Sequence, residues 1–269
     1  MCYLRCPACR GPLVDADPLR CARCDRSYPI VDGIPALIVA PLDAEETRRK
    51  LAEVRRQMLA YPAFLAAMAV LGPAWIPRER RRMIERAGLR PGMTVLDHCT
   101  GPGSNLQAIA AIVGSAGRIV AMDLLPTMAR RARDLARRKA IAADVQQADA
   151  LALPYADGYF DAVVHCGTVN QFGAGKRRAV DEMLRVTRED GTIVIVDEGV
   201  RRPESWRGRL LIARNPLFGS HPPLDLVPPG ADARLEWMMG GMFWHLQFRK
   251  PKSALQIDSA CRSAGLQSV

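Results

Sequence analysis

The sequence predicts an α/β fold in which helices cover both faces of a mostly parallel sheet. Between residues 93 and 198, short apolar runs typical of buried strands alternate with helical segments. The first run is followed by a turn containing Gly101 and Gly103. Strands that alternate with helices form parallel sheets with right-handed crossovers. A strand, a glycine-rich turn and a helix are the usual nucleotide-cofactor seat of a doubly wound, Rossmann-like domain.

The elements of this domain follow from the same pattern. The first strand, which contains Val95 and Leu96, is expected to end at Asp97, and Ser104 is expected to cap the next helix, 105–113, by accepting a backbone N–H. The remaining strands are expected at 117–123, 145–150, 159–166 and 191–198, with helices at 78–87, 126–140 and 176–186.

The last third of the chain is less regular. A helix is expected over 203–217, followed by a proline-rich loop. Gly240-Gly241 separates two strand-like runs, 234–239 and 242–249, and therefore predicts an antiparallel hairpin. The tail, 253–269, would add a helix; in an alternative register that helix leads into a final strand at Leu266.

Two Cys-x-x-Cys motifs mark residues 1–40 as a separate small unit. Cys6 and Cys9 form one, Cys21 and Cys24 the other, with eleven residues between them. Four thiolates at this spacing suit tetrahedral Zn²⁺ in a closed structural site. The unit is too short to bury a core of its own, so the metal would supply most of its folding free energy. The alternatives are a redox dithiol or chance spacing.

Residues 41–77 are expected to form a helical linker and cap. A charged helix over 41–57 has Asp43 as a plausible N-cap. Residues 58–77 carry no charge, but Pro62, Gly72 and Pro73 break them into pieces too short to span a membrane. A cap or core helix is favoured, and contact with a membrane surface is the alternative.

Five motifs follow one another along the chain: Val95-Leu96-Asp97 with Gly101 and Gly103, Asp123, Asp149 to Tyr155, Phe160 to Val164, and Leu184 to Thr192. Together, and in this order, they resemble the class I S-adenosylmethionine (SAM)-dependent methyltransferases, and more narrowly the ubiquinone and menaquinone C-methyltransferases. The resemblance covers residues 78–200, within a catalytic domain expected over 78–269. Cys99 stands where that family most often has the first glycine of the turn. The N-terminal unit is similar to small zinc-ribbon partners of tRNA and protein methyltransferases, here fused in cis.

The resemblance implies a cofactor site and gives its residues roles. Asp97 lies near the methionine portion of SAM, and Asp123 hydrogen-bonds the ribose hydroxyls, with a helix N-cap as its alternative role. Asp149 and Ala150 meet the adenine edge, and Leu124 and Leu151 pack on the ring. The predicted cofactor-binding residues are Asp97, Cys99, Gly101, Gly103, Asp123, Leu124, Asp149, Ala150 and Cys166.

Catalytic residues are harder to assign. His165 and His98 are candidate general bases, although strand alternation does not settle which side chains enter the pocket, and a structural histidine is the alternative. Cys99 and Cys166 could form a thiol pair on the pocket floor, or both could be small apolar filler. The aromatic and methionine side chains between 237 and 244 could line an apolar substrate pocket or belong to the sheet core.

Composition bounds the function. The 269 residues carry a formal charge of +10, which suits nucleic acid, anionic lipid or acidic substrates, or else reflects arginines on solvated helix faces. No run has the aromatic and basic pattern of an RNA-binding strand surface, so nucleic acid is not favoured. Residues 1–6 lack the apolar core of a signal peptide, and eight cysteines suggest reduced thiols, so we expect a cytoplasmic chain.

We therefore expect SAM-dependent methyl transfer to a small, apolar or aromatic acceptor, with structural Zn²⁺ in the ribbon. One alternative is a methyltransferase that docks RNA or protein through the ribbon and the basic helices. Another is a methyltransferase fold reused as a non-methylating enzyme or binding module.

Overall fold

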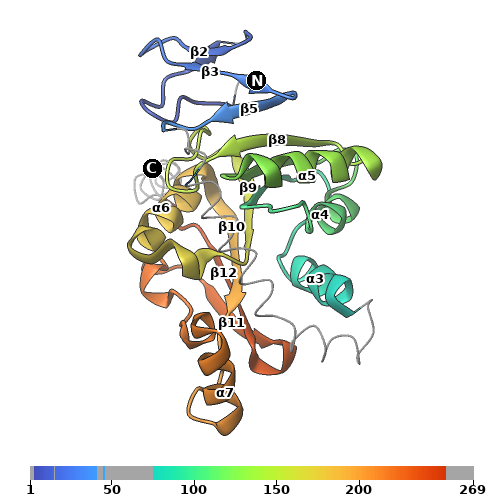
Figure 1. The fold of residues 1–269 in the computed structure, drawn as a ribbon, viewed down its shortest axis with the longest axis vertical. Coiled ribbons are helices and arrows are strands. Elements are labelled where there is room, and N and C mark those ends of the chain that lie inside the picture. Colours follow the sequence, from blue (N-terminus) through green and yellow to red (C-terminus); the bar gives the residue numbers. More distant parts are fainter. Residues whose placement is uncertain (1–2, 15, 41–44, 46–74, 253–269) are drawn as a thin grey trace, which may run out of the picture.

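The computed structural model describes residues 3–14, 16–40, 45 and 75–252 (Figure 1). The expected helix at 41–57, most of the uncharged segment and the tail at 253–269 lie outside the described residues. No helix in the described part of the chain is long and apolar enough to cross a membrane.

A nine-stranded sheet organises the chain, in the order β11-β12-β10-β9-β6-β7-β8-β5-β4. Its five central strands run parallel, as the sequence predicts. Strand β10 begins four residues earlier than expected, with a register shift between Thr187 and Thr192. The central strands are β6 (Thr94–His98), β7 (Arg118–Asp123), β8 (Ala143–Ala148), β9 (Phe160–Cys166) and β10 (Thr187–Glu198).

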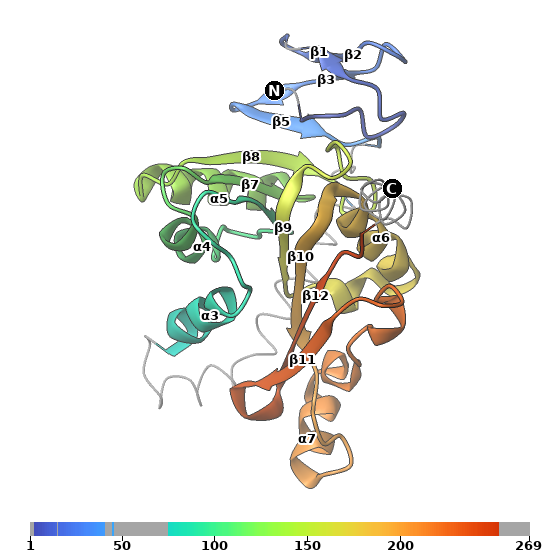
Figure 2. The same ribbon diagram turned by 180° about the vertical axis from the view of Figure 1, so that it is seen from behind.

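Helices cover both faces of this sheet, and two hydrophobic cores result (Figures 1 and 2). On one face lie α3 (Trp75–Glu85), α4 (Leu106–Val113) and α5 (Pro126–Arg138), and on the other lies α6 (Lys176–Val186). Because strand side chains alternate, Val95 packs into the first core and Leu96 into the second. Helix α3 begins three residues before the expected domain boundary at 78.

The C-terminal part confirms the predicted hairpin. Strand β11 (Ala233–Met238) pairs antiparallel with β12 (Phe243–Arg249), which in turn pairs antiparallel with β10. Both glycines of the turn have left-handed φ angles, 68° at Gly240 and 86° at Gly241, which glycine adopts without a Cβ clash. The helix expected at 203–217 is shorter, α7 (Trp206–Arg214), followed by short 3-10 turns η2 (Pro216–Gly219) and η3 (Leu224–Leu226).

The N-terminal unit continues the large sheet, which the sequence did not lead us to expect. Strands β1 (Leu13–Val14), β2 (Leu19–Cys21) and β3 (Ser27–Tyr28) form a small sheet of their own. Strands β4 (Ile30–Val31) and β5 (Ile34–Leu37) form a hairpin, and β5 pairs in parallel with β8 through Ala36↔Gln147 and Leu37↔Ala148 (Figure 2). The ribbon thus covers an edge of the catalytic sheet that would otherwise expose unpaired backbone groups.

Candidate functional site

The candidate site lies where the central strands end. Asp97 is the next-to-last residue of β6, Asp123 the last of β7, and His165 the next-to-last of β9. Because these strands are parallel, their carboxyl ends meet at one edge of the sheet, which is where ligands of such folds bind.

Asp97 holds the turn after β6 in place. Its side chain is fully buried, and its two carboxylate oxygens accept hydrogen bonds from Thr100 Oγ1 and, at 2.8 Å, from Asn105 Nδ2. Burial raises the pKa of Asp97. Asn105 occupies the N-cap position of α4, so the prediction that Ser104 caps this helix is wrong. Neither residue caps the helix through its side chain, because that of Asn105 is engaged by Asp97.

The turn has three left-handed residues, Cys99 (φ 56°), Gly101 (φ 57°) and Gly103 (φ 87°). A Cβ on Gly103 would come within 2.9 Å of Leu106 Cδ1 and 3.1 Å of Ala132 Cα, so this glycine permits close packing of α4 and α5. A Cβ on Gly101 would meet nothing within 4 Å, so a ligand could approach this side of its backbone. Cys99 has a Cβ, so its left-handed conformation costs about 1 kcal/mol.

Asp123 accepts two backbone hydrogen bonds. Its Oδ2 receives the N–H of Gly101 and its Oδ1 the N–H of Leu125, both at 2.9 Å. Asp123 is not the N-cap considered as its alternative role, because Leu125 occupies that position of α5. Burial raises the pKa of Asp123 to about 6. Each carboxylate oxygen can accept a further bond, so these contacts are compatible with the predicted ribose contact.

The residues expected around adenine lie on the loops after β7 and β8. Asp149 Oδ1 accepts the N–H of Leu151 at 2.9 Å, and Ala150 is buried beside it. Gln147 Nε2 donates to the carbonyl oxygen of Leu124 at 3.0 Å, which ties the two loops together. The adenine contacts of these residues stay predictions.

His98 and His165 pair with each other. They are register partners on β6 and β9, both fully buried, and their Nδ1 atoms lie 2.7 Å apart. Burial lowers the pKa of His98 to about 4 and that of His165 well below its ordinary value. Each is therefore a neutral but weak base at neutral pH, which argues against the general-base role. The sequence shows a histidine near the end of each of these two strands. It does not show the register between the strands, so the pairing of the histidines could not be predicted.

Cys99 and Cys166 lie on opposite faces of the sheet, so the thiol pair considered as one alternative is not formed. Cys99 packs against the α6-side core and Cys166 against the α4-side core. Sequence reasoning missed Arg80 of α3, which donates to Cys166 Sγ at 3.4 Å and to Asn105 Oδ1 at 2.9 Å. Arg80 therefore connects α3 to the turn after β6 and to the end of β9.

A cavity of about 800 Å³ lies beside the end of β10. It is formed by the segment 200–202, by α7 and by the hairpin turn. Trp206, Leu210, Trp237 and Met242 give it an apolar lining, and Arg201, Arg202 and Arg207 also line it. The cavity combines apolar walls with several positive charges.

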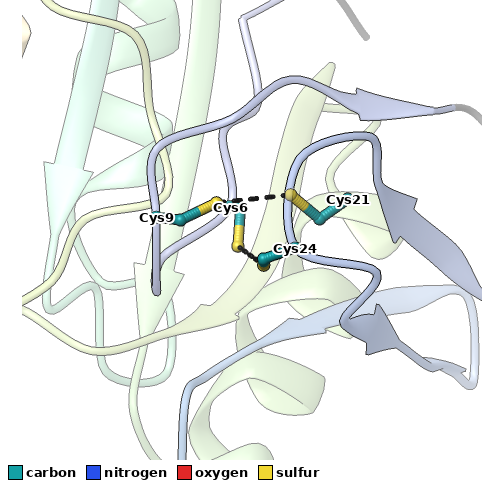
Figure 3. Close-up of side chains that lie close together, drawn as sticks. All are labelled: Cys6, Cys9, Cys21 and Cys24. Carbon is teal, nitrogen blue, oxygen red and sulfur yellow. Dashed lines mark hydrogen bonds between the residues drawn. The ribbon is translucent and has the colours of Figure 1, made fainter.

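The four ribbon cysteines converge as predicted (Figure 3). The Sγ atoms of Cys9 and Cys21 lie 3.4 Å apart and those of Cys6 and Cys24 3.7 Å apart. Zn–S bonds of about 2.3 Å in a tetrahedron place sulfur atoms about 3.8 Å apart, so the cluster fits a structural zinc ion. The backbone N–H groups of Gly11 and Arg23 donate to Cys9 and Cys21, at 3.4 and 3.3 Å, which stabilises thiolates.

The ribbon packs on the connection between β8 and β9. The N–H of Arg5 donates to the carbonyl oxygen of Pro154, and the N–H of Ala156 to that of Tyr3, both at 2.9 Å. The buried Tyr3 hydroxyl accepts from Gln146 Nε2 of β8 at 3.1 Å. The same connection begins with Asp149 and Ala150.

Comparisons with known proteins find similarities for both parts of the chain. Residues 95–191 match the methyltransferase domain family, and residues 3–33 match the Trm112p-like protein family. An uncharacterized protein of Mycobacterium tuberculosis is 32% identical over 173 residues, 64% of this chain and 57% of its own length. The ubiquinone/menaquinone biosynthesis C-methyltransferase of Ectopseudomonas mendocina is 36% identical over 120 residues, 44% of this chain and 46% of its own. The chain thus spans only about half of these relatives.

Solved structures share the fold. A SAM-dependent methyltransferase from Aquifex aeolicus aligns with a TM-score of 0.51 at 19% identity, over 66% of this chain and 93% of that one. A complex between the Haloferax volcanii Trm112 methyltransferase activator and the putative methyltransferase aligns with a TM-score of 0.50 at 15% identity, over 72% of this chain and 96% of that one. The cyclase SpnF gives 0.52 at 18% identity, over 66% and 81%. The fold is therefore that of class I methyltransferases, which also supports other reactions.

Proposed function

We propose that this chain, in which a Trm112p-like region precedes a methyltransferase domain, transfers the methyl group of SAM to a small apolar or aromatic acceptor. The observation that carries the cofactor assignment is the geometry at the carboxyl ends of β6 and β7. There the backbone of Gly101, which a ligand could approach from one side, lies against the carboxylate of Asp123. A carboxylate at the end of the second strand, next to such a turn, is where doubly wound folds bind a ribose.

Methyl transfer from a sulfonium needs little chemistry from the protein. The reacting carbon is already activated, so the protein has to align the acceptor and exclude water. The buried carboxyl edge of the sheet suits that task. A base is required only for an acceptor that must lose a proton.

The acceptor class is inferred from the cavity beside β10. Its tryptophan, leucine and methionine side chains suit an apolar or aromatic molecule, and its arginines would suit an acidic substituent on that molecule. A quinone-like acceptor is consistent with the relative named as a ubiquinone/menaquinone C-methyltransferase. The cavity and the turn formed by residues 99–103, called the cofactor turn below, both lie at the carboxyl ends of the parallel strands.

The test is calorimetric titration with SAM and with its demethylated product, comparing wild type with Asp123→Ala. Binding by the wild type that the substitution abolishes, with the melting temperature of the variant measured in parallel, supports the cofactor seat. An acceptor screen with apolar aromatic compounds follows. Folded, zinc-loaded protein that binds neither compound would overturn the proposal.

A second candidate is methylation of RNA or protein docked through the ribbon. The Trm112p-like match favours it, because one structural neighbour is a complex of a Trm112 methyltransferase activator. Nucleic-acid binding whose affinity falls steeply with salt would support this candidate. SAM binding without methylation of any acceptor would instead point to a reused fold.

A further inference from the structure

Three potential metal ligands gather at the carboxyl ends of β6 and β9. His98 and His165 face each other across the two strands, and Cys99 directly follows His98. One ligand atom from each of the three side chains lies within 4.8 Å of the other two. This cluster is separate from the four ribbon cysteines, the other such group among the described residues.

Packing alone does not account for the histidines. Both imidazoles are fully buried, and their one mutual hydrogen bond joins the two Nδ1 atoms. The Nε2 atom of His98 has no partner within hydrogen-bonding geometry among the described residues, although an interaction with the Ala150 backbone opposes the lowering of its pKa by burial. Buried polar atoms are rarely left in this way without a ligand, water or ion.

Two residues beside the pair also have unusual backbone conformations. Cys99 has φ 56° and Thr168 has φ 108°, although neither is glycine. Thr168 Oγ1 lies 3.5 Å from His165 Nε2. Such strain persists where the surrounding structure determines it, and it is common at functional sites.

We propose that His98, Cys99 and His165 form a second metal site that binds Zn²⁺ with one coordination position open. Imidazole nitrogen and thiolate sulfur are the donors that zinc prefers, and three protein ligands are typical of sites that leave room for a substrate or water. His98 can offer its unpartnered Nε2 atom to the ion, and Zn–N bonds of about 2.0–2.1 Å would place that atom about 3.3 Å from the nitrogen that His165 offers.

The location suggests what the ion does. His98 follows Asp97 directly, so the metal lies at the edge that holds the cofactor turn. An acceptor hydroxyl or thiol bound at the open position would have a lowered pKa and release its proton to solvent. The resulting oxygen or sulfur then forms a bond to the methyl carbon as the carbon–sulfonium bond breaks, leaving a neutral thioether. This role rests on the proposed function, whereas metal binding does not.

Zinc stoichiometry tests the site. Purified full-length protein is dialysed against zinc-free buffer, and zinc per chain is measured by mass spectrometry for wild type, His165→Gln, Cys99→Gly and the control His245→Gln. Cys99→Gly removes the thiolate where the left-handed backbone favours glycine, so it should preserve the fold. His245 is buried in β12, away from the cluster, and reports the cost of replacing a buried histidine.

We expect two zinc ions per chain in wild type and His245→Gln, and one in His165→Gln and Cys99→Gly. Cobalt-substituted wild type should show a sulfur-rich tetrahedral spectrum together with a second, nitrogen-rich band set that is absent from Cys99→Gly. One zinc in wild type, unchanged in both cluster variants, overturns the metal site. Calorimetric measurement of SAM binding distinguishes the two proposals. A protein that binds SAM but only one zinc ion would support methyl transfer and not the second metal site. A protein that binds two zinc ions but no SAM would support the second metal site and not methyl transfer.

Discussion

The backbone N–H of Arg5 donates to the carbonyl oxygen of Pro154 at 2.9 Å, which joins the ribbon to the connection between β8 and β9. An isolated antiparallel bridge between Leu4 and Tyr155 strengthens the same contact. That connection begins at Asp149, where we expect the adenine of the cofactor. The ribbon therefore supports one wall of the predicted cofactor site, although its own metal lies outside it.

Loss of the ribbon zinc should weaken cofactor binding. Cys24→Ser removes one of the four ligands, and because bound metal would contribute to the folding free energy of the ribbon, the contacts to Pro154 and Ala156 should loosen. We expect SAM affinity to fall about tenfold, which corresponds to about 1.4 kcal/mol. Calorimetry on the full chain measures it.

Val14→Ser is the matched control, because Val14 lies on the ribbon, is 53% exposed and is not a zinc ligand. It should leave SAM affinity unchanged. Equal affinities for Cys24→Ser and wild type, with zinc shown to be absent from the ribbon, would separate the ribbon from the cofactor site.

Cofactor binding should depend on pH through Asp123. Burial raises its pKa to about 6, so the carboxylate needed for the ribose hydroxyls is lost as pH falls through that value. SAM affinity should therefore decline below pH 6, approaching tenfold per pH unit, and Asp123→Asn should remove this dependence. Calorimetry between pH 5 and 8 tests both. A slope that survives in Asp123→Asn would assign the titration to another group.

The sign for stability is opposite. A carboxyl whose folded pKa is above its ordinary value holds extra protons in the folded state. Protonated Asp123 therefore stabilises the folded state below about pH 4, and this stabilisation is lost as pH rises to about 6. The free energy of unfolding, measured with denaturant, should fall between pH 4 and 6 in wild type relative to Asp123→Asn. The same pH dependence in both proteins would contradict the raised pKa of Asp123.

The sequence predicted best what local pattern controls. The alternation of strands with helices predicted the parallel sheet, and Gly240-Gly241 predicted the hairpin. Each strand, helix and turn in these predictions is recognised from a short stretch of neighbouring residues. The pairing of β5 with β8 was missed because the two strands lie more than 100 residues apart in the chain and Pro35 argues against a strand. Ser104 and Asn105 are both good capping residues, and only the tertiary contact with Asp97 determines what Asn105 does.

The histidine pair shows the same limit at the site. Alternation along Val163, Val164 and His165 fixes that neighbouring side chains point to opposite faces, but not which face holds the pocket. Only the register between β6 and β9 brings His98 opposite His165. Candidate residues could thus be read from the sequence, whereas their juxtaposition could not.

Arg185 should be important for stability. Its side chain is 12% exposed and donates to the carbonyl oxygens of Leu153 and Tyr155 and to Glu182. Arg185→Ala removes this donor from the two carbonyl oxygens and leaves the buried Glu182 with Arg10 and the N–H of Leu153, so we expect a loss of about 3 kcal/mol in the free energy of unfolding. Arg81→Ala removes an exposed pair with Glu85 and should cost less than about 1 kcal/mol. Urea denaturation distinguishes them, and similar losses would refute the structural role of Arg185.

The acceptor cavity can be tested with Trp206→Ala. Trp206 lines the cavity but is 69% exposed, so its removal should cost little stability while it removes apolar contact area from a bound acceptor. We expect KM for an apolar aromatic acceptor to rise about tenfold, with SAM affinity unchanged, because the tryptophan lies on α7 and not on the cofactor turn. Leu224→Ala, which is 50% exposed and does not line this cavity, is the control. Steady-state kinetics at saturating SAM measure both variants, and an unchanged KM in Trp206→Ala would place the acceptor elsewhere along the carboxyl edge of the sheet.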